Sequence, residues 1–550
     1  MIVKNTTSQN RSKQERLKAE HFVPTQVSGV PKIIDFLNYL LQLSNEFSKE
    51  QVLYSIGYHL ISNSKNEAVK KFLSEYNYDV IEIEEPIPDT FDLLGSAYQY
   101  LNTKLENLEK GSFYTPNAIA KDFVDDLCFE NGETIFDPSC GSGAFLFNSN
   151  AKPEQIYGVD FDPIAVMIAK FNYFIKFPDA AYPNIFHADF FEWYLSNANL
   201  RFDYIIGNPP YGANIDVSKI KTSCVETGES FSYFIEFSYK LLSEKGILRF
   251  LLPEALLNVK RHFDIRGFIL NDANLSKIKR YSKKFAGVMS DVYMIELDKN
   301  RCEKVEFHFD EVASIPKDLY RDLRNQIFIF VNDMDAQIIG EVRSRKGYDL
   351  KDSIFGLGVV TGDNKTKLFK EQLPGSEPIY TGKEIIKKYN FIEPKNYIIF
   401  DRNNLQQVAP DEIYRSPVKL VYKVINKNLK FVIDTTGALT TNSANIVIPK
   451  IDDLDIYTIL ALLNSDVIDF MHLKMFGGVN KVAKEHLMDL PLPALTSEQN
   501  MTMSLLAKEA VMNDDDSKLQ NYINHDVFGF GDEIVSYIKS CVQSAGRNRR

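Results

Sequence analysis

The stretch FDYIIGNPPYG, residues 202–212, decides how the middle of this chain folds. Its first five residues are mostly β-branched or aromatic, which predicts a buried strand. Gly207 and the two prolines after it must end that strand, because proline cannot donate to a sheet ladder or continue a helix. The residues Asn208, Pro209, Pro210 and Tyr211 therefore follow a strand end, which is where open α/β sheets bind their ligands.

Similar short apolar runs surround this stretch and predict a sheet. The runs are TIFDPSC, QIYGVDFDP, NIFHADFF and GILRFLLP, and helix-length segments such as PIAVMIAKFNYFIKF and SYFIEFSYKLLSE separate them. Short buried strands that alternate with helices are typical of a parallel sheet with crossover helices, so the predicted fold class is α/β and Rossmann-like. The segments VYMIELD and KVEFHFD alternate, and we expect them to close the sheet as antiparallel strands.

The remainder of the chain divides by its periodicity. The segments IIDFLNYLLQLSNEF, EAVKKFLSEY and TFDLLGSAYQYLNTKLENLE have helical spacing, whereas the last third mixes strands with lysines and prolines. We therefore predict an N-terminal helical region (1–108), an α/β catalytic domain (109–312), a connecting region (313–351) and a C-terminal α+β domain with a helical last part (352–550).

Composition limits the class of protein. The chain has 550 residues, enough for several domains, and no apolar run of the length that spans a bilayer. Its start lacks the apolar core of a signal peptide, so we expect a cytoplasmic protein that contacts no membrane. Five scattered cysteines without a CxxC pair predict reduced thiols, no disulfide framework and no metal site. The net charge is −11, but residues 260–284 carry eight Lys or Arg against two Asp, which suits phosphate contacts.

Two motifs in the first half of the predicted sheet suggest a nucleoside site. FDPSCGSGAF (136–145) places Asp137 at a strand end before Gly141 and Gly143, but it lacks the GK[ST] of a phosphate loop. Asp137 beside such a turn suits a cation better than a diphosphate. Asp160 ends the next strand, where a carboxylate can accept both hydroxyls of a ribose. Together the motifs suggest a nucleoside that bears a positive group, and a glycine turn without a ligand is the alternative.

Two aromatic motifs can complete that site. GSFYTP (111–116) precedes the first strand, and its paired rings either pack as core or cover an adenine and a sulfonium methyl group. FHADFF ends the third strand with Asp189, an acceptor for an exocyclic amine, next to the ring of Phe190. The alternatives are a helix cap for Asp189 and a core position for Phe190.

The series F-Y-T-P, D-P-x-C-G-S-G, G-V-D, A-D-F and N-P-P-Y resembles the gamma class of S-adenosylmethionine-dependent DNA methyltransferases that act on adenine N6. The resemblance covers roughly residues 109–297. It implies a methyltransferase sheet, S-adenosylmethionine as the cofactor without a metal, and double-stranded DNA as the partner. It assigns catalysis to Asn208, Pro209, Pro210 and Tyr211. The cofactor-binding residues that it implies are Phe113, Tyr114, Thr115, Pro116, Asp137, Pro138, Gly141, Gly143, Asp160, Phe161, Asp189, Phe190 and Asn208.

The N-P-P-Y chemistry follows from the weak nucleophilicity of the adenine amine, whose lone pair is delocalised into the ring. Two fixed acceptors, the side-chain oxygen of Asn208 and the backbone carbonyl of Pro209, can draw the nitrogen toward tetrahedral geometry and stabilise its growing positive charge. Tyr211 then offers a ring to a base that has left the duplex. Phe285 lies at the distance from its strand where the family has a second aromatic contact to the target base.

The C-terminal region resembles the target-recognition domains of type I specificity subunits and of methyltransferases with a fused recognition domain. The segments that carry this resemblance are GLGVVTGDNKTKLF, YTGKEIIKKY and ILALLNSDVIDFMHLKMFGGVNKVAKEHLMDLPLP. The implied role is sequence reading, with lysines and Arg402 as candidate contacts. An oligomerisation or regulatory domain is the alternative.

Other functions remain open at this point. An N-P-P-Y motif also suits a methyltransferase that acts on RNA or on a protein glutamine, and a non-catalytic DNA specificity subunit is a third possibility. We find no PD…(D/E)xK cluster in the N-terminal helices, so we expect DNA cleavage, if it occurs, to come from a separate restriction endonuclease. The sequence assigns neither a recognition site nor an oligomeric state.

Overall fold

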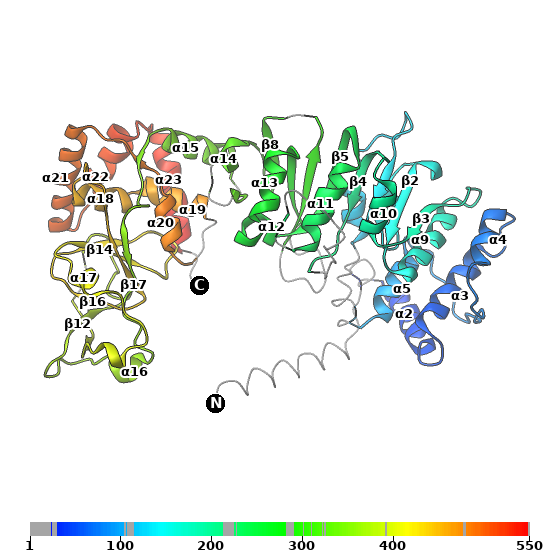
Figure 1. The fold of residues 1–550 in the computed structure, drawn as a ribbon, viewed down its shortest axis with the longest axis horizontal. Coiled ribbons are helices and arrows are strands. Elements are labelled where there is room, and N and C mark those ends of the chain that lie inside the picture. The colour runs from blue at the N-terminus through cyan, green and yellow to red at the C-terminus, as the bar shows by residue number, and fades with distance from the viewer. Residues whose placement is uncertain are drawn as a thin grey trace. The chain divides into compact units, whose positions relative to one another are not determined.

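The structure is a computed structural model of the chain, and it forms two compact units, residues 1–328 and residues 329–550. The residues that it describes are 24, 30–103, 106, 115–212, 225–226, 228–281, 291–300, 302–309, 311–321, 323, 326–329, 331–390, 393–476 and 480–547. Each unit has its own sheet and its own helices (Figure 1).

The first unit is built on a nine-stranded mixed sheet with the order β3-β2-β1-β4-β5-β7-β6-β8-β9. The strands are β1 (Ile135–Asp137), β2 (Ile156–Asp160), β3 (Asn184–His187), β4 (Phe202–Gly207), β5 (Leu242–Pro253), β6 (Leu275–Tyr281), β7 (Val292–Asp298), β8 (Lys304–His308) and β9 (Val312–Pro316). The first five run parallel, and the chain order reverses at β1, which pairs with β2 on one side and β4 on the other. Such a reversal opens a crevice at the carboxyl ends of the strands.

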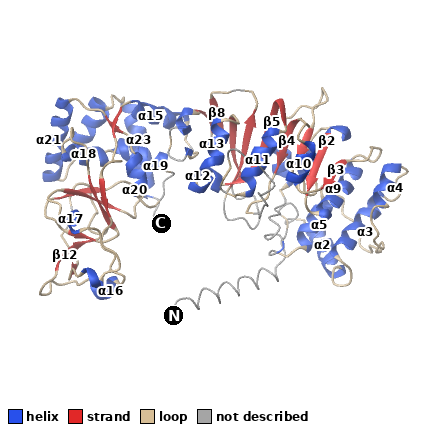
Figure 2. Ribbon diagram, viewed as in Figure 1, coloured by secondary structure: helices blue, strands red, loops and turns tan. Residues whose placement is uncertain are grey.

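Helices cover both faces of this sheet (Figure 2). The helices of the first unit are α2 (Pro31–Leu43), α3 (Lys49–Ile61), α4 (Glu67–Leu73), α5 (Leu93–Leu101), α7 (Asn117–Asp122), α8 (Ala144–Asn148), α9 (Pro163–Lys176), α10 (Phe190–Asn197), α11 (Ser230–Lys240), α12 (Ala255–Asn258), α13 (Phe263–Asn271) and α14 (Asp318–Arg321), with short 3-10 turns at Pro153–Gln155 and Lys260–His262. Successive residues of β1 point to opposite faces: Ile135 joins the core under α8 and α9, whereas Phe136 stacks on Trp193 of α10.

The end of the sheet differs from the sequence prediction in three respects. The strand β7 is antiparallel to β5 as expected, but its side chains are nearly all buried because it lies between two strands with both faces covered. The strand β8 is parallel to β6 and antiparallel only to β9. The strand β6 was not predicted, because its LSKIKRY sequence is too basic to be distinguished from a charged surface segment.

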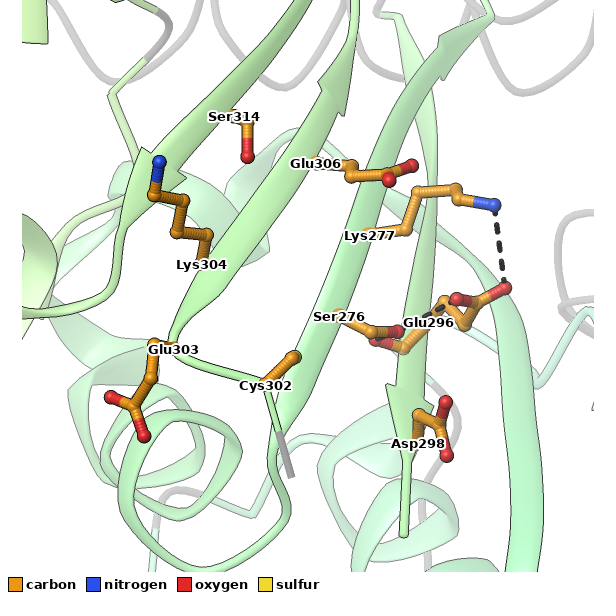
Figure 3. A pocket seen from close by; sticks show the side chains of 9 residues that line it. All are labelled: Ser276, Lys277, Glu296, Asp298, Cys302, Glu303, Lys304, Glu306 and Ser314. Atoms are coloured by element: carbon orange, nitrogen blue, oxygen red, sulfur yellow. Dashed lines mark hydrogen bonds and ion pairs between the residues drawn. The ribbon is translucent and has the colours of Figure 1, made fainter. Parts of the chain in front are cut away.

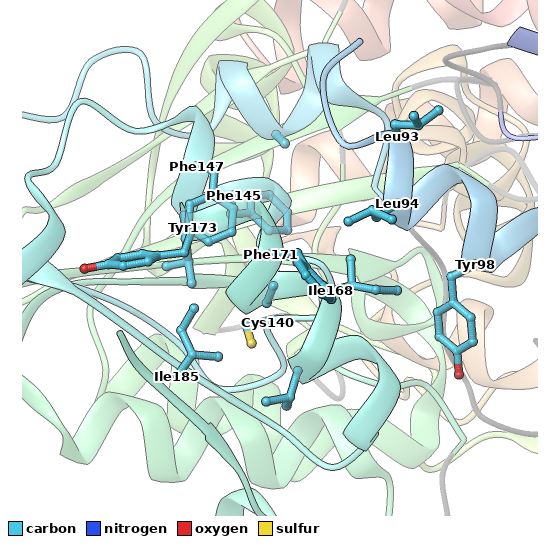
Figure 4. Close-up of a cluster of buried hydrophobic side chains, with 14 of the residues drawn as sticks. Leu93, Leu94, Tyr98, Cys140, Phe145, Phe147, Ile168, Phe171, Tyr173 and Ile185 are labelled. Carbon is cyan, nitrogen blue, oxygen red and sulfur yellow. The ribbon is translucent and has the colours of Figure 1, made fainter. Parts of the chain in front are cut away.

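The N-terminal helices belong to the same core as the sheet. Leu93 and Leu94 of α5 lie in the cluster of buried side chains that also contains Phe145 of α8 and Ile168 and Phe171 of α9 (Figure 4). The helix α3 packs against α9 as well, where Tyr54 meets the Phe171 ring edge-on. The predicted helical region and the predicted catalytic domain therefore share one core, and the sheet continues to β9, inside the segment predicted to be a connection.

The second unit combines small sheets with helices. Its strands are β10 (Lys346–Tyr348), β11 (Ile354–Gly356), β12 (Glu377–Tyr380), β13 (Tyr397–Ile398), β14 (Lys419–Lys423), β15 (Phe431–Asp434), β16 (Leu439–Thr440), β17 (Ala444–Ile448) and β18 (Leu492–Pro493). Its helices are α15 (Asp333–Ser344), α16 (Asn364–Lys367), α17 (Asp411–Tyr414), α18 (Ile456–Leu463), α19 (Asp466–Met475), α20 (Lys484–Asp489), α21 (Ser497–Asn513), α22 (Ser517–Tyr522) and α23 (Asp532–Arg547), with a 3-10 turn at Arg402–Asn404 and a π-helical turn at Ile523–Val527. The largest sheet has the order β11-β17-β14-β15. Within the described part of the chain no single helix is long and apolar enough to cross a membrane, and only the bent pair α18 and α19 meets that test jointly.

Two glycine substitutions test the packing of the N-terminal helices on α9. A Cβ at Gly57 of α3 would lie 2.5 Å from the Phe171 ring, whereas a Cβ at Gly340 of α15 would meet no atom within 4 Å. We expect Gly57→Ala to destabilise the first unit by about 1–3 kcal/mol through overpacking. Gly340→Ala should stabilise the second unit by about 0.5–1 kcal/mol through helix propensity. Calorimetric unfolding of the full chain measures both, and an unchanged first-unit transition in Gly57→Ala would contradict the packing described.

Candidate active site

The candidate site lies where β1, β2 and β4 end side by side. Because the three strands are parallel neighbours, Asp137, Asp160 and Asn208 meet at the same edge of the sheet. The backbone of β4 passes close to Asp137, since a Cβ at Gly207 would lie 2.7 Å from its Oδ1 atom. Gly207 therefore both ends the strand and leaves room for the carboxyl group of Asp137.

Asp137 is a buried carboxyl group with one oxygen that lacks a hydrogen-bond partner. Its Oδ1 accepts the backbone N–H of Ser139 at 2.9 Å, whereas its Oδ2 has no hydrogen-bond partner among the described residues, although Asp137 is only 1 % exposed. Burial raises the pKa of Asp137 well above its usual range, and the nearby charge of Asp160 raises it further. A buried acid in this state is prepared to accept a positively charged group.

The glycine turn is held against Asp160. The backbone N–H of Gly141 donates to Asp160 Oδ2 at 2.8 Å, and the N–H of Asp162 donates to Oδ1 at 2.8 Å. Gly143 has a φ of +87° and begins α8, so the turn requires a residue without a Cβ there. Burial raises the pKa of Asp160 to about 6. Among the described residues, each carboxylate oxygen of Asp160 has one hydrogen-bond donor, which leaves acceptor capacity for a ligand hydroxyl.

The Asn208 side chain is held from two directions. Its Nδ2 donates to Thr115 Oγ1 at 3.3 Å, and its Oδ1 accepts the Tyr211 hydroxyl at 2.5 Å. The Tyr211 hydroxyl is also 2.7 Å from the backbone carbonyl of Leu251, and burial raises its pKa. The ring of Tyr211 meets Phe231 of α11 edge-on. The acceptor that the sequence assigned to a substrate amine is therefore bonded to the phenol in this structure.

The three carbonyls of the Asn-Pro-Pro segment have different partners. The Asn208 carbonyl accepts the Ser139 hydroxyl at 3.4 Å, and the Pro210 carbonyl accepts the Ser230 hydroxyl at 2.5 Å. The Pro209 carbonyl between them accepts no hydrogen bond from any described residue. Two of the carbonyls are thus fixed by serines from other elements, and the middle one keeps its acceptor capacity.

Three further predicted residues, Asp189, Phe190 and Phe161, differ in burial and in their contacts. Asp189 caps α10, because its Oδ1 accepts the N–H groups of Phe191 and Glu192 at 2.9 and 3.1 Å. Phe190 is a core residue, 3 % exposed, and stacks on Phe234 of α11. The structure therefore agrees with the alternatives given above, a helix cap for Asp189 and a core position for Phe190. Phe161, by contrast, is 75 % exposed directly after Asp160.

For the remaining predicted residues the structure gives position only. Pro116 precedes α7, and Pro138 is buried in the turn after β1. Phe113, Tyr114 and Phe285 lie outside the described residues.

Sequence reasoning missed the residues that support the site from other elements. Ser139 and Ser230 fix the carbonyls described above, and Asp92 and Tyr98 of the N-terminal helices contact the loops that carry Gly141 and Asp160. No signal in the sequence marks them, because Ser, Asp and Tyr are common at helix starts and in helix cores. Their partners lie up to 69 positions away in the sequence, so only the fold reveals them.

The residues present fit the cofactor that the resemblance implies. A buried carboxyl oxygen without a partner suits a cationic group, and the carboxylate of Asp160 suits the hydroxyls of a ribose. Open space surrounds Gly141, where a Cβ would meet no atom within 4 Å, so a ligand can approach the backbone there. The exposed ring of Phe161 offers a face to a base.

A second hollow on the first unit has a different character. It is a pocket of about 510 Å³ over β6 to β9, and Figure 3 shows its polar lining, with Ser276, Lys277 and Glu296 close together. Lys277 and Glu296 form an ion pair at 3.8 Å, and the Ser276 hydroxyl bonds Glu296 at 2.7 Å. None of the sequence-predicted site residues lines it. Among the described residues no group of three or more His, Cys, Asp or Glu could hold a metal ion.

Arg402 of the second unit already has partners within its own loop. Its guanidinium donates to the Ala409 carbonyl at 2.6 Å and to Asp411 at 2.5 Å. The side chain is nevertheless 41 % exposed. The contacts give Arg402 a structural role in this loop, beside the role in DNA contact that the sequence suggested.

The sheet has this order, its first two strands each end in an acidic residue, and Asn-Pro-Pro-Tyr follows the fourth, an arrangement typical of α/β methyltransferases that act on amino groups. Comparison with known families agrees with this class. Residues 89–326 match the family described as N-6 DNA Methylase, and residues 377–492 match the TaqI-like C-terminal specificity domain. The chain therefore combines an N-6 DNA methylase domain with a TaqI-like C-terminal specificity domain, and the curated proteins to which it is similar are methyltransferases of restriction–modification systems. The methyl donor of this methylase family is S-adenosylmethionine.

Individual relatives cover different parts of the chain. The type II methyltransferase M.VspI of Vibrio sp. (strain 343) is 29% identical over 333 residues, which are 58% of this chain and 80% of that protein. The type I restriction enzyme MjaIX methylase subunit of Methanocaldococcus jannaschii is 34% identical over 145 residues, but these span only 25% of its length. Among solved structures, the type IIL restriction-modification enzyme MmeI in complex with DNA has a TM-score of 0.52 at 11% identity, covering 94% of this chain and 95% of that one. This last likeness is one of fold.

The state of Asp137 predicts that cofactor binding releases a proton. Burial raises the pKa of Asp137, whereas a cation beside the carboxyl group favours its ionised form, so the fraction of Asp137 that is protonated in the free protein should release its proton on binding. Asp160, with a pKa of about 6, is already mostly ionised at about pH 7.5 and should contribute little. Calorimetric titration with S-adenosylmethionine in buffers of different ionisation enthalpy measures this release. We expect Asp137→Asn to reduce it, and equal release by both proteins would contradict the assignment.

Proposed function

We propose that this protein is a site-specific methyltransferase that modifies the exocyclic N6 of an adenine rotated out of duplex DNA, with Asn208, Pro209 and Tyr211 at the reacting centre. When bound, S-adenosylmethionine supplies an electrophilic methyl group on a sulfonium sulfur. The observation that carries the proposal is the pair of acceptors on one segment, Asn208 Oδ1 and the Pro209 carbonyl, at the same sheet edge as the carboxyl groups of Asp137 and Asp160.

The two acceptors orient the amine. Asn208 Oδ1 and the Pro209 carbonyl each accept one N–H bond of the adenine, which draws the nitrogen toward tetrahedral geometry and withdraws its lone pair from conjugation with the ring. The neighbouring carbonyls are fixed by Ser139 and Ser230, so the acceptors are held in place before the substrate arrives. Dipoles that are fixed in advance need no reorganisation when positive charge develops on the nitrogen, which is the main source of their catalytic effect.

Tyr211 exchanges one partner for another when the adenine enters. Its hydroxyl bonds Asn208 Oδ1 at 2.5 Å, and the carbonyl of Leu251 is a second acceptor at 2.7 Å. The Tyr211 O–H can therefore turn to donate to the Leu251 carbonyl. This leaves Asn208 Oδ1 available to the substrate, and the O–H keeps a hydrogen-bond acceptor. The Tyr211 ring then supports the extruded base by stacking.

The C-terminal specificity domain favours DNA over the alternative substrates. A methyltransferase for RNA or a protein glutamine has no need of the TaqI-like domain matched at residues 377–492, and a non-catalytic specificity subunit has no need of the complete glycine turn and Asn-Pro-Pro-Tyr. We place base reading in the second unit and expect cleavage, if the system has it, from a separate endonuclease. The described cysteines 128, 140, 302 and 541 form no disulfide. Free thiols and a DNA substrate both fit a protein of the cytoplasm.

Substitution of Asn208 tests the proposed chemistry. We expect Asn208→Ala to lower the single-turnover rate of methyl transfer by about 100-fold or more, because it removes a fixed acceptor. Its affinity for S-adenosylmethionine should stay within about threefold of the wild type, because Asp137 and Asp160 are unchanged. DNA from a host that expresses the wild-type chain should carry N6-methyladenine in one sequence motif, and DNA from the Asn208→Ala host should not. Methylation at normal density by the variant would refute the mechanism.

A pair of substitutions separates the ring of Tyr211 from its hydroxyl. Tyr211→Phe keeps the ring and leaves Asn208 Oδ1 to the substrate, so its single-turnover rate should stay within about threefold of the wild type. Tyr211→Ala removes the stacking surface and should slow transfer roughly 10- to 100-fold. Fluorescence of 2-aminopurine at the target position reports the extruded base in both variants. A Tyr211→Phe variant as slow as Tyr211→Ala would assign the hydroxyl, and not the ring, the larger role.

A further inference from the structure

The N-terminal helix α5 contacts the glycine turn through Asp92. The Asp92 carboxylate accepts the Ser142 hydroxyl at 2.5 Å and the Asn172 amide at 2.8 Å, and Asn172 also donates to the Ser142 carbonyl at 3.0 Å. Ser142 is the residue between Gly141 and Gly143. The turn that approaches the cofactor is therefore anchored from behind by a carboxylate that is 8 % exposed.

Asp92 adopts a conformation that side chains rarely take. Its φ is +51° and its ψ is +46°, in the left-handed region, and it caps α5 by accepting the Gly95 N–H at 3.0 Å. A residue other than glycine in this region carries a cost in free energy that surrounding contacts must offset. Here those contacts are the bonds to Ser142 and Asn172, so the strained cap and the glycine turn form one hydrogen-bonded unit.

The same helix contacts the loop after β2 through Tyr98. The Tyr98 hydroxyl donates to Asp162 Oδ2 at 2.5 Å, and the side chain is 2 % exposed. Asp162 in turn caps α9 through Ile164, and its own N–H donates to Asp160 Oδ1 at 2.8 Å. Tyr98 thus contacts Asp162, and Asp162 contacts Asp160, whose carboxylate is assigned to the ribose.

We infer that α5 is a positioning element of the cofactor site, in which Asp92 and Tyr98 hold the glycine turn and the Asp160 loop in register with each other. The inference rests on the proposed cofactor role of that edge of the sheet. The two loops contact each other directly through the hydrogen bond from the Gly141 N–H to Asp160. The distance between the loops therefore decides whether Asp160 can keep this bond and also accept the hydroxyls of a ribose. The two residues act through Ser142 and Asp162 and have no part in the transfer step itself.

The helix offers a matched control for this role. Tyr100 stands two positions from Tyr98, is buried as well, and donates its hydroxyl to Asn38 Oδ1 of α2 at 2.6 Å, away from both loops. Tyr98→Phe and Tyr100→Phe each delete one buried hydroxyl that bonds a side-chain oxygen, and each keeps the ring in the core. A general loss of packing or stability should affect both variants alike.

The experiment is a calorimetric titration of the full chain with S-adenosylmethionine in the absence of DNA, together with steady-state kinetics. Tyr98→Phe should weaken cofactor binding roughly 5- to 20-fold and raise the KM for the cofactor correspondingly, with kcat at saturation within about threefold. Tyr100→Phe should bind within about twofold of the wild type. Asp92→Ala should weaken binding at least as much as Tyr98→Phe, and Asp92→Asn, which keeps an acceptor for Gly95, should restore part of it.

Two outcomes would overturn the inference. Equal losses of affinity in Tyr98→Phe and Tyr100→Phe would show that α5 acts only through general packing, and unchanged affinity in Tyr98→Phe would show that the bond to Asp162 has no bearing on the site. If Asp92→Ala does not fold, the two tyrosine variants and Asp92→Asn still decide the question. The titration contains no DNA, so a failure of the Asn208 mechanism would leave this result standing.

Discussion

The parallel pairing of β1 with β4 is the contact on which the rest of the site depends. It brings the ends of two strands that are distant in the chain, Ile135–Asp137 and Phe202–Gly207, to one edge of the sheet. Gly207 has no Cβ and so leaves room for the Asp137 carboxyl group against β4. Without this pairing the acidic turn and the Asn-Pro-Pro-Tyr segment would be two unrelated motifs. With it, the Asp137 carboxyl group and the Asn208 side chain lie at the same edge of the sheet, as the proposed site requires.

The site collects acidic groups in a part of the protein where ionisation is costly. Asp92, Asp137 and Asp160 all have raised pKa values with burial as the largest cause, and Asp160 raises that of Asp137 further. Such a cluster costs stability in the empty protein, because buried carboxylates repel each other and lose hydration. A positively charged nucleoside would offset that cost, which gives the arrangement a physical reason for preferring this ligand charge.

Rigid support distinguishes this site from a flexible loop. Serines from two other elements hold the carbonyls beside Pro209, and the helix α5 reaches both loops of the cofactor edge. The N-terminal helices that read as a separate region in the sequence are continuous with the core of the sheet. Catalytic and binding groups perform best when a second set of residues limits their movement, and here that set comes from distant parts of the chain.

The sequence by itself determined the parallel sheet from β1 to β5 and the residues at its carboxyl edge, because each of these features is encoded within about ten consecutive residues by strand pattern and strand-end chemistry. Only the tertiary structure decided the surroundings of those residues. It placed Phe190 in the core and made Asp189 a cap, inserted β6, and joined the Tyr211 hydroxyl to Leu251. The positioning role that we propose for α5 depends on bonds that span 50 and 64 positions, from Asp92 to Ser142 and from Tyr98 to Asp162. Contacts of that range leave no local pattern, since either partner alone is an ordinary helix residue or turn residue.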